Sequence, residues 1–221
     1  MPPKAKFTVL DESLYAYLAA HRTPDDDVAR ELQEETARLG ERAVMQVSPD
    51  QGTLIRILVA AIGARCAIEI GTFTGYSALA IARGLPADGR LVCLDVSSEW
   101  TTIAQRFWAA AGVAERIELR LGPAAETLRA LPEEPTVDFA FIDADKKGYP
   151  LYWEEVVRRL KPGGLVVVDN VFRRGDVIRP EQTGEGIRAI RQLNEMVLAD
   201  ARVESVMLAV ADGLTLARRL P

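Results

Sequence analysis

Histidine and cysteine are scarce in this 221-residue sequence, which contains one histidine and two cysteines. Zinc prefers exactly these two residue types as ligands, so their scarcity disfavours a zinc site. His21 lies far upstream of every other candidate residue, and we expect it on the surface near a helix end, without a chemical role. Cys66 and Cys93 lie in apolar, strand-like runs without a CxxC partner, and we expect both to be small buried side chains.

The chain also lacks an excess of positive charge and long apolar runs. Its formal net charge of -5 disfavours a protein that holds phosphate backbones by a broad positive potential, so nucleic acid is not an expected partner. The apolar runs at 57–62 and 164–168 are far too short to cross a bilayer. Asp11 and Glu12 interrupt the N-terminal stretch before it takes the form of a signal peptide. We therefore expect a cytoplasmic protein without a membrane segment.

Two common phosphate-binding loops are missing as well. The sequence has no G-x-x-x-x-G-K-[ST], and three residues separate Gly71 from Gly75, which does not match G-x-G-x-x-G. These absences weaken a P-loop or dinucleotide-binding interpretation. The segment from Glu69 to Ser77 still places glycines between a strand and a helix, where the backbone can approach a ligand.

Short apolar runs and helical patterns alternate over most of the chain. Five β-rich runs, each followed by a helical pattern, stand at 67–70, 91–95, 117–121, 137–142 and 165–169. Continuous apolar strands in this alternation predict an α/β fold, a parallel sheet covered by helices on both faces. The Asp212-Gly213 pair between the apolar runs 203–210 and 214–218 predicts a closing hairpin.

Residues 1–44 are predicted to form a helical extension of a core that spans residues 45–221. The charged helical pattern from Asp11 to Leu39 has only a thin apolar stripe. Ser48, Pro49 and Gln51 then supply the N-cap, the first-turn proline and the capping-box partner of a new helix. Because no repeat or long linker divides the chain, we expect a single domain.

Acidic residues stand where the predicted strands end, which is where open parallel sheets bind ligands. The five positions are Glu69, Asp95, Gly122, Asp143 and Asp169. A purely structural interpretation does not explain four acids among five strand ends. Asp95 is suited to accept both hydroxyls of an adenosine ribose. The alternative for Asp95 is an N-cap of the next helix.

Adjacent strand ends are expected to bring Asp143, Asp169 and Asn170 together. Two carboxylates and one amide oxygen suit Mg²⁺ or Mn²⁺, and Ca²⁺ is also possible. Lys146 is the candidate general base, because a nearby divalent cation disfavours its ammonium form. The alternative is a solvated lysine that opens a helix, as the neighbouring Lys147 suggests.

The segments EIGTFTGYSALA, AFIDADK and VVVDN carry a resemblance to a known family. Together with MQVSPDQG and the terminal ADGLTLARR, in this order and at these spacings, the sequence resembles the metal-dependent O-methyltransferases that include caffeoyl-CoA and catechol O-methyltransferases. The resemblance spans residues 45–219. Within that family it is most similar to small bacterial members associated with antibiotic biosynthesis.

The resemblance implies a Rossmann-like S-adenosylmethionine methyltransferase fold, with a seven-stranded, mostly parallel sheet whose last strand is antiparallel. It also implies S-adenosylmethionine as cofactor, a divalent metal held by Asp143, Asp169 and Asn170, Lys146 as the base, and a homodimer. The residues it places in the cofactor site are Val47, Glu69, Gly71, Thr72, Ser77, Asp95, Ala124, Asp143 and Asp145.

A metal-chelating acceptor needs two adjacent oxygens, so a catechol-like diol or a hydroxymalonyl unit on an acyl carrier protein would serve. Arg173 and Arg174 stand where relatives that act on aromatic diols often have Trp and a small polar residue. Arginine pairs bidentately with carboxylate, which favours an acidic acceptor. The alternative is a solvated pair of loop charges.

Two further functions stay open at this point. A tRNA-modifying methyltransferase on the same fold would use its arginines for phosphate contacts, although the acidic balance opposes it. A module that only senses S-adenosylmethionine would have no use for Lys146 or for the metal ligands.

Overall fold

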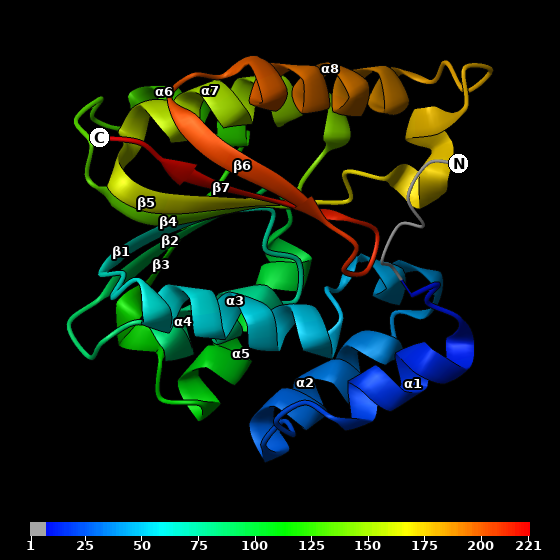
Figure 1. Ribbon diagram of the computed structural model, residues 1–221. Helices are drawn as coiled ribbons and strands as arrows, with labels where there is room; N and C mark the ends of the chain where they lie inside the picture. Colours follow the sequence, from blue (N-terminus) through cyan, green and yellow to red (C-terminus); the bar gives the residue numbers. More distant parts are fainter. Residues whose placement is uncertain (1–7) are drawn as a thin grey trace.

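The computed structural model describes residues 8–221 and has a seven-stranded sheet at its centre (Figure 1). The first seven residues, part of the stretch considered above as a signal peptide, lie outside the described residues. Along the sheet the strands follow the order β3-β2-β1-β4-β5-β7-β6. None of the helices in residues 8–221 is long and apolar enough to cross a membrane.

The strands occur close to the predicted runs. They are β1 Cys66–Ile70, β2 Arg90–Asp95, β3 Ile117–Leu121, β4 Val137–Ile142, β5 Leu160–Asp169, β6 Val203–Leu208 and β7 Leu214–Arg219. β7 runs antiparallel to both β5 and β6, and β6 and β7 form the hairpin predicted at Asp212-Gly213. β5 begins earlier than predicted, because Leu160 pairs with Val137 before a register shift, and Pro162 and Gly163 hide this extension in the sequence.

Helices cover both faces of the sheet, as predicted (Figure 1). On one face lie α3 Pro49–Ala61, α4 Tyr76–Gly84 and α5 Ser98–Ala110, and on the other α6 Ala124–Ala130, α7 Tyr149–Arg159 and α8 Glu185–Ala199. Short 3₁₀ helices are η1 Gly40–Met45, η2 Ala114–Arg116, η3 Lys146–Gly148 and η4 Arg173–Ile178. Phe139 and Phe141 of β4 belong to one hydrophobic core and Ala140 and Ile142 to the other. Burial on both faces explains the continuous apolar strands.

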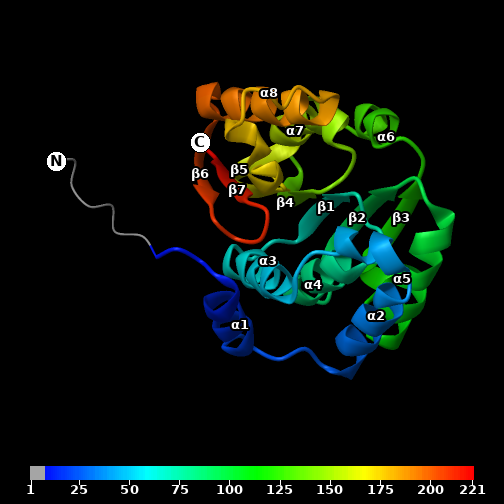
Figure 2. The same cartoon turned by 90° about the vertical axis from the view of Figure 1, so that its right-hand side faces the viewer.

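The N-terminal extension consists of two helices, α1 Glu12–Ala20 and α2 Asp27–Ala37, beside α3, α4 and α5 (Figure 2). The single helical pattern expected from Asp11 to Leu39 is therefore broken. Asp11 caps α1 by accepting from the N–H of Leu14, and Asp26 caps α2 by accepting from the N–H of Ala29. The division of the chain at residue 45 stays a prediction.

Three smaller predictions have different outcomes. α3 begins at Pro49, and the Ser48 N–H donates to Gln51 Oε1 at 3.0 Å, as the capping pattern indicated. His21 is exposed at the end of α1, as expected, and its ring stacks on Tyr17. Cys93 is buried, but Cys66 is exposed, so the prediction for Cys66 is wrong. Cys66 is the first residue of β1, and the strand is buried only from Ala67 onward.

Candidate active site

The carboxyl ends of β1, β2, β4 and β5 face a cavity of about 1110 Å³. Its wall also includes residues 44–48, before α3, and part of η4. The structure places all but one of the predicted site residues in this wall: Val47, Gly71, Thr72, Ser77, Asp95, Ala124, Asp143, Asp145, Lys146, Asp169, Asn170, Arg173 and Arg174. The exception is Glu69.

The turn between β1 and α4, residues 71–75, is called the glycine loop below. Gly71 has φ +86°, and a Cβ there would lie 1.9 Å from the carbonyl oxygen of Asp143. Gly75 also has φ +86°, and a Cβ would lie 2.5 Å from Ala104. Between them Phe73 adopts φ 51°, a region that costs energy for residues with a side chain. The glycine loop thus exposes backbone groups without large side chains to the cavity, directly before the N-terminus of a helix, where backbone N–H groups can contact a ligand.

Asp95 stabilises the glycine loop by hydrogen bonds. Its Oδ2 accepts hydrogen bonds from the N–H groups of Thr72 and Phe73, each at 2.8 Å, and its Oδ1 accepts from the N–H of Ser97. The N-cap of α5 is Ser97, which accepts from the Trp100 N–H, so the N-cap alternative for Asp95 is wrong. A carboxylate has about four acceptor positions, which leaves Asp95 able to accept a further hydrogen bond from the cavity.

Glu69 lies inside the sheet and is fully buried. Burial raises the pKa of its carboxyl to about 8, because the charged form loses its hydration. Cys93 Sγ lies 3.5 Å from Glu69 Oε2, while Oε1 has no hydrogen-bond partner among the described residues. Because Glu69 does not line the cavity, its position does not support the direct cofactor contact that the resemblance implies.

Asp143 and Asp169 stand at the ends of the neighbouring strands β4 and β5. Asp169 is buried, and burial together with the nearby Asp143 carboxylate raises its pKa to about 7. Asn170 follows with φ 59°. No group of three His, Cys, Asp or Glu residues in the described chain could hold a metal, so a site here needs the Asn170 amide as its third ligand. This all-oxygen set, with two mutually repelling carboxylates, fits a hard divalent cation.

Lys146 turns into this site, whereas Lys147 does not. Lys146 Nζ donates to Asp143 Oδ1 at 2.8 Å and lies 2.6 Å from the hydroxyl of Tyr149. The Lys146 side chain is 16% exposed, but that of Lys147 is 63% exposed and pairs with Glu185. The alternative of a solvated lysine is therefore wrong for Lys146, although its neighbour Lys147 is solvent-exposed.

Arg173 and Arg174 both have a left-handed backbone, with φ 47° and 55°. Arg174 is exposed, and its N–H donates to Asp212 Oδ1 at 2.6 Å. Neither guanidinium forms an ion pair with a residue between 8 and 221, and Arg173 Nε is buried there without a partner. Both residues line the cavity, and neither guanidinium donates a hydrogen bond to any residue between 8 and 221.

Several cavity residues escaped the sequence analysis, which concentrated on strand ends. Tyr149 is not part of the cavity wall, but it is fully buried beside Lys146 and stands three residues after it on the chain, a helical spacing that could have indicated it. Gln51 lines the cavity and is 2% exposed, but the sequence pattern explained it as a helix cap alone. Trp100 also lines the cavity, with its ring 5.0 Å from that of Phe73. Tyr152 donates to Asp145, which in turn accepts from the Gly148 N–H.

Comparison with known families settles the class of this site. The sequence model described as O-methyltransferase matches residues 19–220. The chain belongs to this O-methyltransferase family. The reaction of this O-methyltransferase is thus the transfer of a methyl group from S-adenosylmethionine to an oxygen atom. The cavity at the strand ends, which the glycine loop borders, lies where open parallel sheets bind their ligands.

Individual relatives cover almost the whole O-methyltransferase chain. A Dictyostelium discoideum protein named "Probable caffeoyl-CoA O-methyltransferase 1" is 39% identical over 214 residues, 95% of this chain and 93% of its own. TomG of Streptomyces achromogenes, an O-methyltransferase involved in tomaymycin synthesis and solved with S-adenosylmethionine, is 32% identical with a TM-score of 0.85, covering 95% and 96% of the two chains. A Bacillus cereus O-methyltransferase solved with S-adenosylhomocysteine is 33% identical with a TM-score of 0.86, covering 94% and 97%.

Proposed function

We propose that this O-methyltransferase depends on a divalent metal held by Asp143, Asp169 and Asn170, with Lys146 as the general base. The observation that carries the proposal is the 2.8 Å contact between Lys146 Nζ and Asp143 Oδ1, beside the buried carboxyl of Asp169. When bound, Mg²⁺ or Mn²⁺ would orient two oxygens of the acceptor and favour the ionised form of its hydroxyl.

The chain's own residues prepare the acceptor for methylation. Lys146 Nζ takes up the proton that the acceptor hydroxyl loses, and Asp143 Oδ1 then stabilises the resulting ammonium group. Tyr149, whose buried hydroxyl lies 2.6 Å from Nζ, fixes the position of the amine. The glycine loop and Asp95 hold the cofactor, and Val47, Ser77, Ala124 and Asp145 complete its surroundings.

The acceptor that we propose is a small molecule with two adjacent oxygens and an acidic group. A catechol-like acid or a hydroxymalonyl unit on an acyl carrier protein has this chemistry, and Arg173 and Arg174 offer donors for the carboxylate. The likeness to TomG supports a place in bacterial secondary metabolism such as antibiotic biosynthesis. A cytoplasmic location belongs to the same proposal.

Chelation tests the metal. Methyl transfer should stop in EDTA and return when Mg²⁺ is added in excess, while binding of S-adenosylhomocysteine in calorimetry persists. EDTA that is already loaded with zinc is the control, because it removes no Mg²⁺ and therefore reports any loss of activity that is not due to chelation. Undiminished turnover in EDTA would sink the metal proposal.

A transfer assay with labelled S-adenosylmethionine tests the acceptor. Catechol, 3,4-dihydroxybenzoate and a hydroxymalonyl acyl carrier protein should be compared, with unmodified tRNA as a further arm. We expect the two acidic acceptors to be methylated faster than catechol, and R174Q to remove this preference. Faster methylation of catechol, or methylation of tRNA alone, would contradict the proposed acceptor class.

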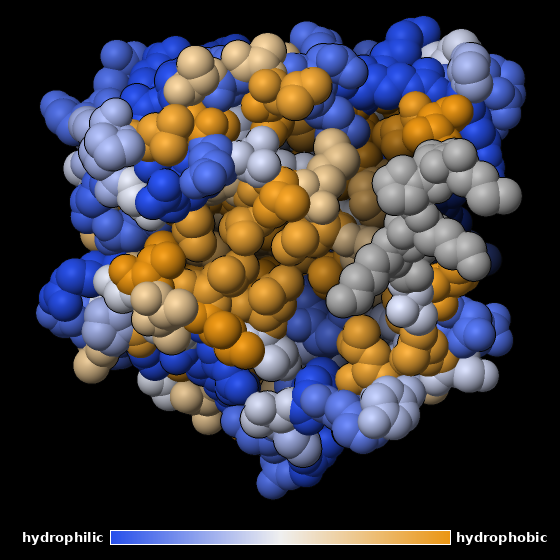
Figure 3. All heavy atoms as spheres, viewed as in Figure 1, coloured by the Kyte–Doolittle hydropathy of each residue, from blue (hydrophilic) through white to orange (hydrophobic). Residues whose placement is uncertain are grey.

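We further propose a homodimer formed through an apolar face on β6 and α3. Val206 of the edge strand β6 is 51% exposed, and Ile57 of α3 is 56% exposed. Figure 3 shows that apolar residues gather in the middle of this side of the molecule. An exposed apolar patch beside an unpaired strand edge favours association with a second protein surface.

A further inference from the structure

The N-terminal helices make polar contacts with the segment that carries the glycine loop. Two contacts, called the anchor pairs below, join residues far apart in the sequence: Thr36 with Thr74, and Asp25 with Tyr76. Thr74 and Tyr76 both line the cavity, and they flank Gly75, the left-handed residue before α4. The extension therefore touches the cofactor-binding segment itself.

The first anchor pair is completely enclosed. Thr36, in the last turn of α2, is 1% exposed and Thr74 is 0% exposed. Thr36 Oγ1 lies 2.8 Å from both the Leu32 carbonyl oxygen and Thr74 Oγ1. Since a hydroxyl has one proton, Thr36 donates to the carbonyl and accepts from Thr74. Without Thr36, the Thr74 hydroxyl would lose this buried partner, which costs free energy.

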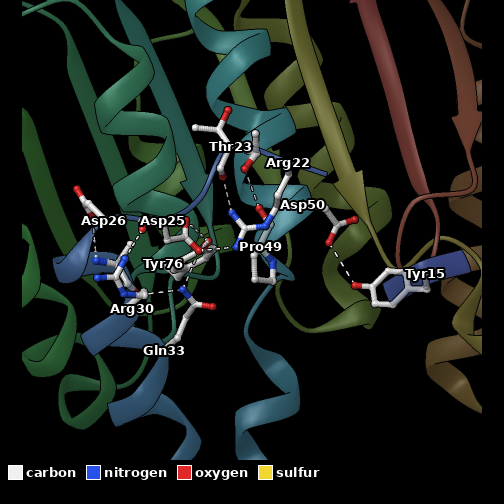
Figure 4. Close-up of polar contacts among 12 residues, drawn as sticks. Tyr15, Arg22, Thr23, Asp25, Asp26, Arg30, Gln33, Pro49, Asp50 and Tyr76 are labelled. Carbon is white, nitrogen blue, oxygen red and sulfur yellow. Dashed lines mark hydrogen bonds and ion pairs between the residues drawn. The ribbon is translucent and has the colours of Figure 1, made fainter. Parts of the chain in front are cut away.

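The second anchor pair is part of a wider network (Figure 4). The Tyr76 hydroxyl donates to Asp25, at 3.1 Å from each carboxylate oxygen. Arg22 and Gln33 also donate to Asp25, at 2.8 and 3.0 Å, which fixes the carboxylate between α1 and α2. Burial, and then the charge of Asp25, raise the pKa of Tyr76, so its hydroxyl stays a donor. Tyr76 also packs against Gly52 of α3.

The glycine loop needs support on more than one side. Phe73 adopts a positive φ that is unfavourable for a residue with a side chain, and the flexible Gly71 and Gly75 on either side do not hold the loop in one conformation by themselves. Asp95 holds the Thr72 and Phe73 N–H groups from the β2 side. The anchor pairs hold the other end of the loop from the side of α2. Molecules whose glycine loop has left this conformation do not bind the cofactor. The apparent affinity for the cofactor therefore falls in proportion to the fraction of such molecules.

We propose that Thr36 and Asp25 are positioning residues for the methyl donor, which keep the glycine loop in its binding conformation through Thr74 and Tyr76. The N-terminal extension is thereby a functional part of the cofactor site, although neither residue lines the cavity. That the methyl donor is S-adenosylmethionine follows from the family. The proposal does not depend on the proposed metal site or on the identity of the methyl acceptor.

The first experiment compares T36V with T36S by calorimetry of S-adenosylhomocysteine binding at a temperature far below unfolding. Valine keeps the shape but removes the hydroxyl, whereas serine retains it. We expect Kd to rise about tenfold in T36V, equivalent to about 1.4 kcal/mol, and to stay close to wild type in T36S. Wild-type affinity in T36V would overturn the role of Thr36.

The second experiment is a double-mutant cycle of D25A and Y76F, so that the test stands even if T36V folds poorly. Each single variant should raise Kd, and the double variant should raise it no further than the larger single effect. The control is E35Q, on the same helix, which breaks an exposed ion pair with Arg106 of α5. D25A and Y76F can lower the unfolding temperature, as any lost contact can. If they nevertheless bind S-adenosylhomocysteine with the affinity of wild type and of E35Q, the anchor pairs are only structural and the proposal fails.

Discussion

Lys146 and Lys147 are adjacent in the sequence, yet their side chains have opposite environments. Lys146 contacts Asp143 and the buried Tyr149, while Lys147 pairs with Glu185 in solvent. K146M should lower methyl transfer at least about 100-fold, because proton acceptance by a positioned base contributes that much. K147M should retain activity, since exposed ion pairs contribute little.

Steady-state rates with the best acceptor, together with S-adenosylhomocysteine affinity, measure this difference. The affinity should be the same in both lysine variants and in wild type. Full turnover in K146M would remove Lys146 from the mechanism.

Glu69 makes the stability of the protein depend on pH. Burial raises its pKa from 4.5 to about 8 in the folded state. Between these two values the folded chain holds a proton that the unfolded chain has lost. The free energy of unfolding therefore falls as pH rises through this window, by at most about 1.4 kcal/mol per pH unit. The contribution is complete below pH 4.5 and is lost as pH passes 8.

E69Q should remove this slope, because glutamine does not titrate. Urea unfolding of both proteins between pH 5 and 9 measures it, and E69Q should gain stability relative to wild type as pH rises. A constant difference between the two proteins across this range would contradict a raised pKa for Glu69.

Among the elements, α8 organises the loop that follows the cavity arginines. Arg191 of α8 donates hydrogen bonds to main-chain carbonyl oxygens of Val177, Gln182 and Asp176, at 3.0, 2.7 and 2.8 Å, and also to that of Arg179. One planar guanidinium thus binds four carbonyl oxygens of residues 176–182. Glutamine or lysine cannot present the same set of donors in one plane.

R191Q should loosen this loop and raise the KM for the acceptor, with little effect on S-adenosylhomocysteine affinity. Hydrogen exchange of residues 174–183 should become faster. R188Q is the matched control, because Arg188 of the same helix donates to only one loop carbonyl, that of Thr183. Equal exchange in R191Q and wild type would show that the loop does not need Arg191.

For the whole molecule, the apolar face of β6 and α3 predicts the assembly state. Sedimentation velocity should give a dimer for wild type and a monomer for V206E, because a buried charge opposes association. L198E is the control, since Leu198 is 81% exposed on α8, a helix outside the proposed interface. A monomeric wild-type protein would contradict the homodimer.

The positions of the central strands could be predicted from sequence, because helices bury both faces of the sheet there and a strand such as β4 is therefore a continuous apolar run. The candidate site followed from the same fact, since Asp95, Asp143 and Asp169 directly follow or end such runs. The apolar stripe continues from α1 into α2, which concealed the break between them although Pro24 and the capping Asp26 mark it. Pro162 and Gly163 resemble a loop and concealed the early start of β5.

By itself, the sequence determined the sheet, the O-methyltransferase family and the residues at the strand ends, because these depend on local runs and short spacings. Tertiary structure alone decided which of two lysines enters the cavity, that Glu69 lies beneath it, and that Thr36 meets Thr74. Burial and contacts between distant residues depend on how helices pack on the sheet, and no local pattern encodes that packing.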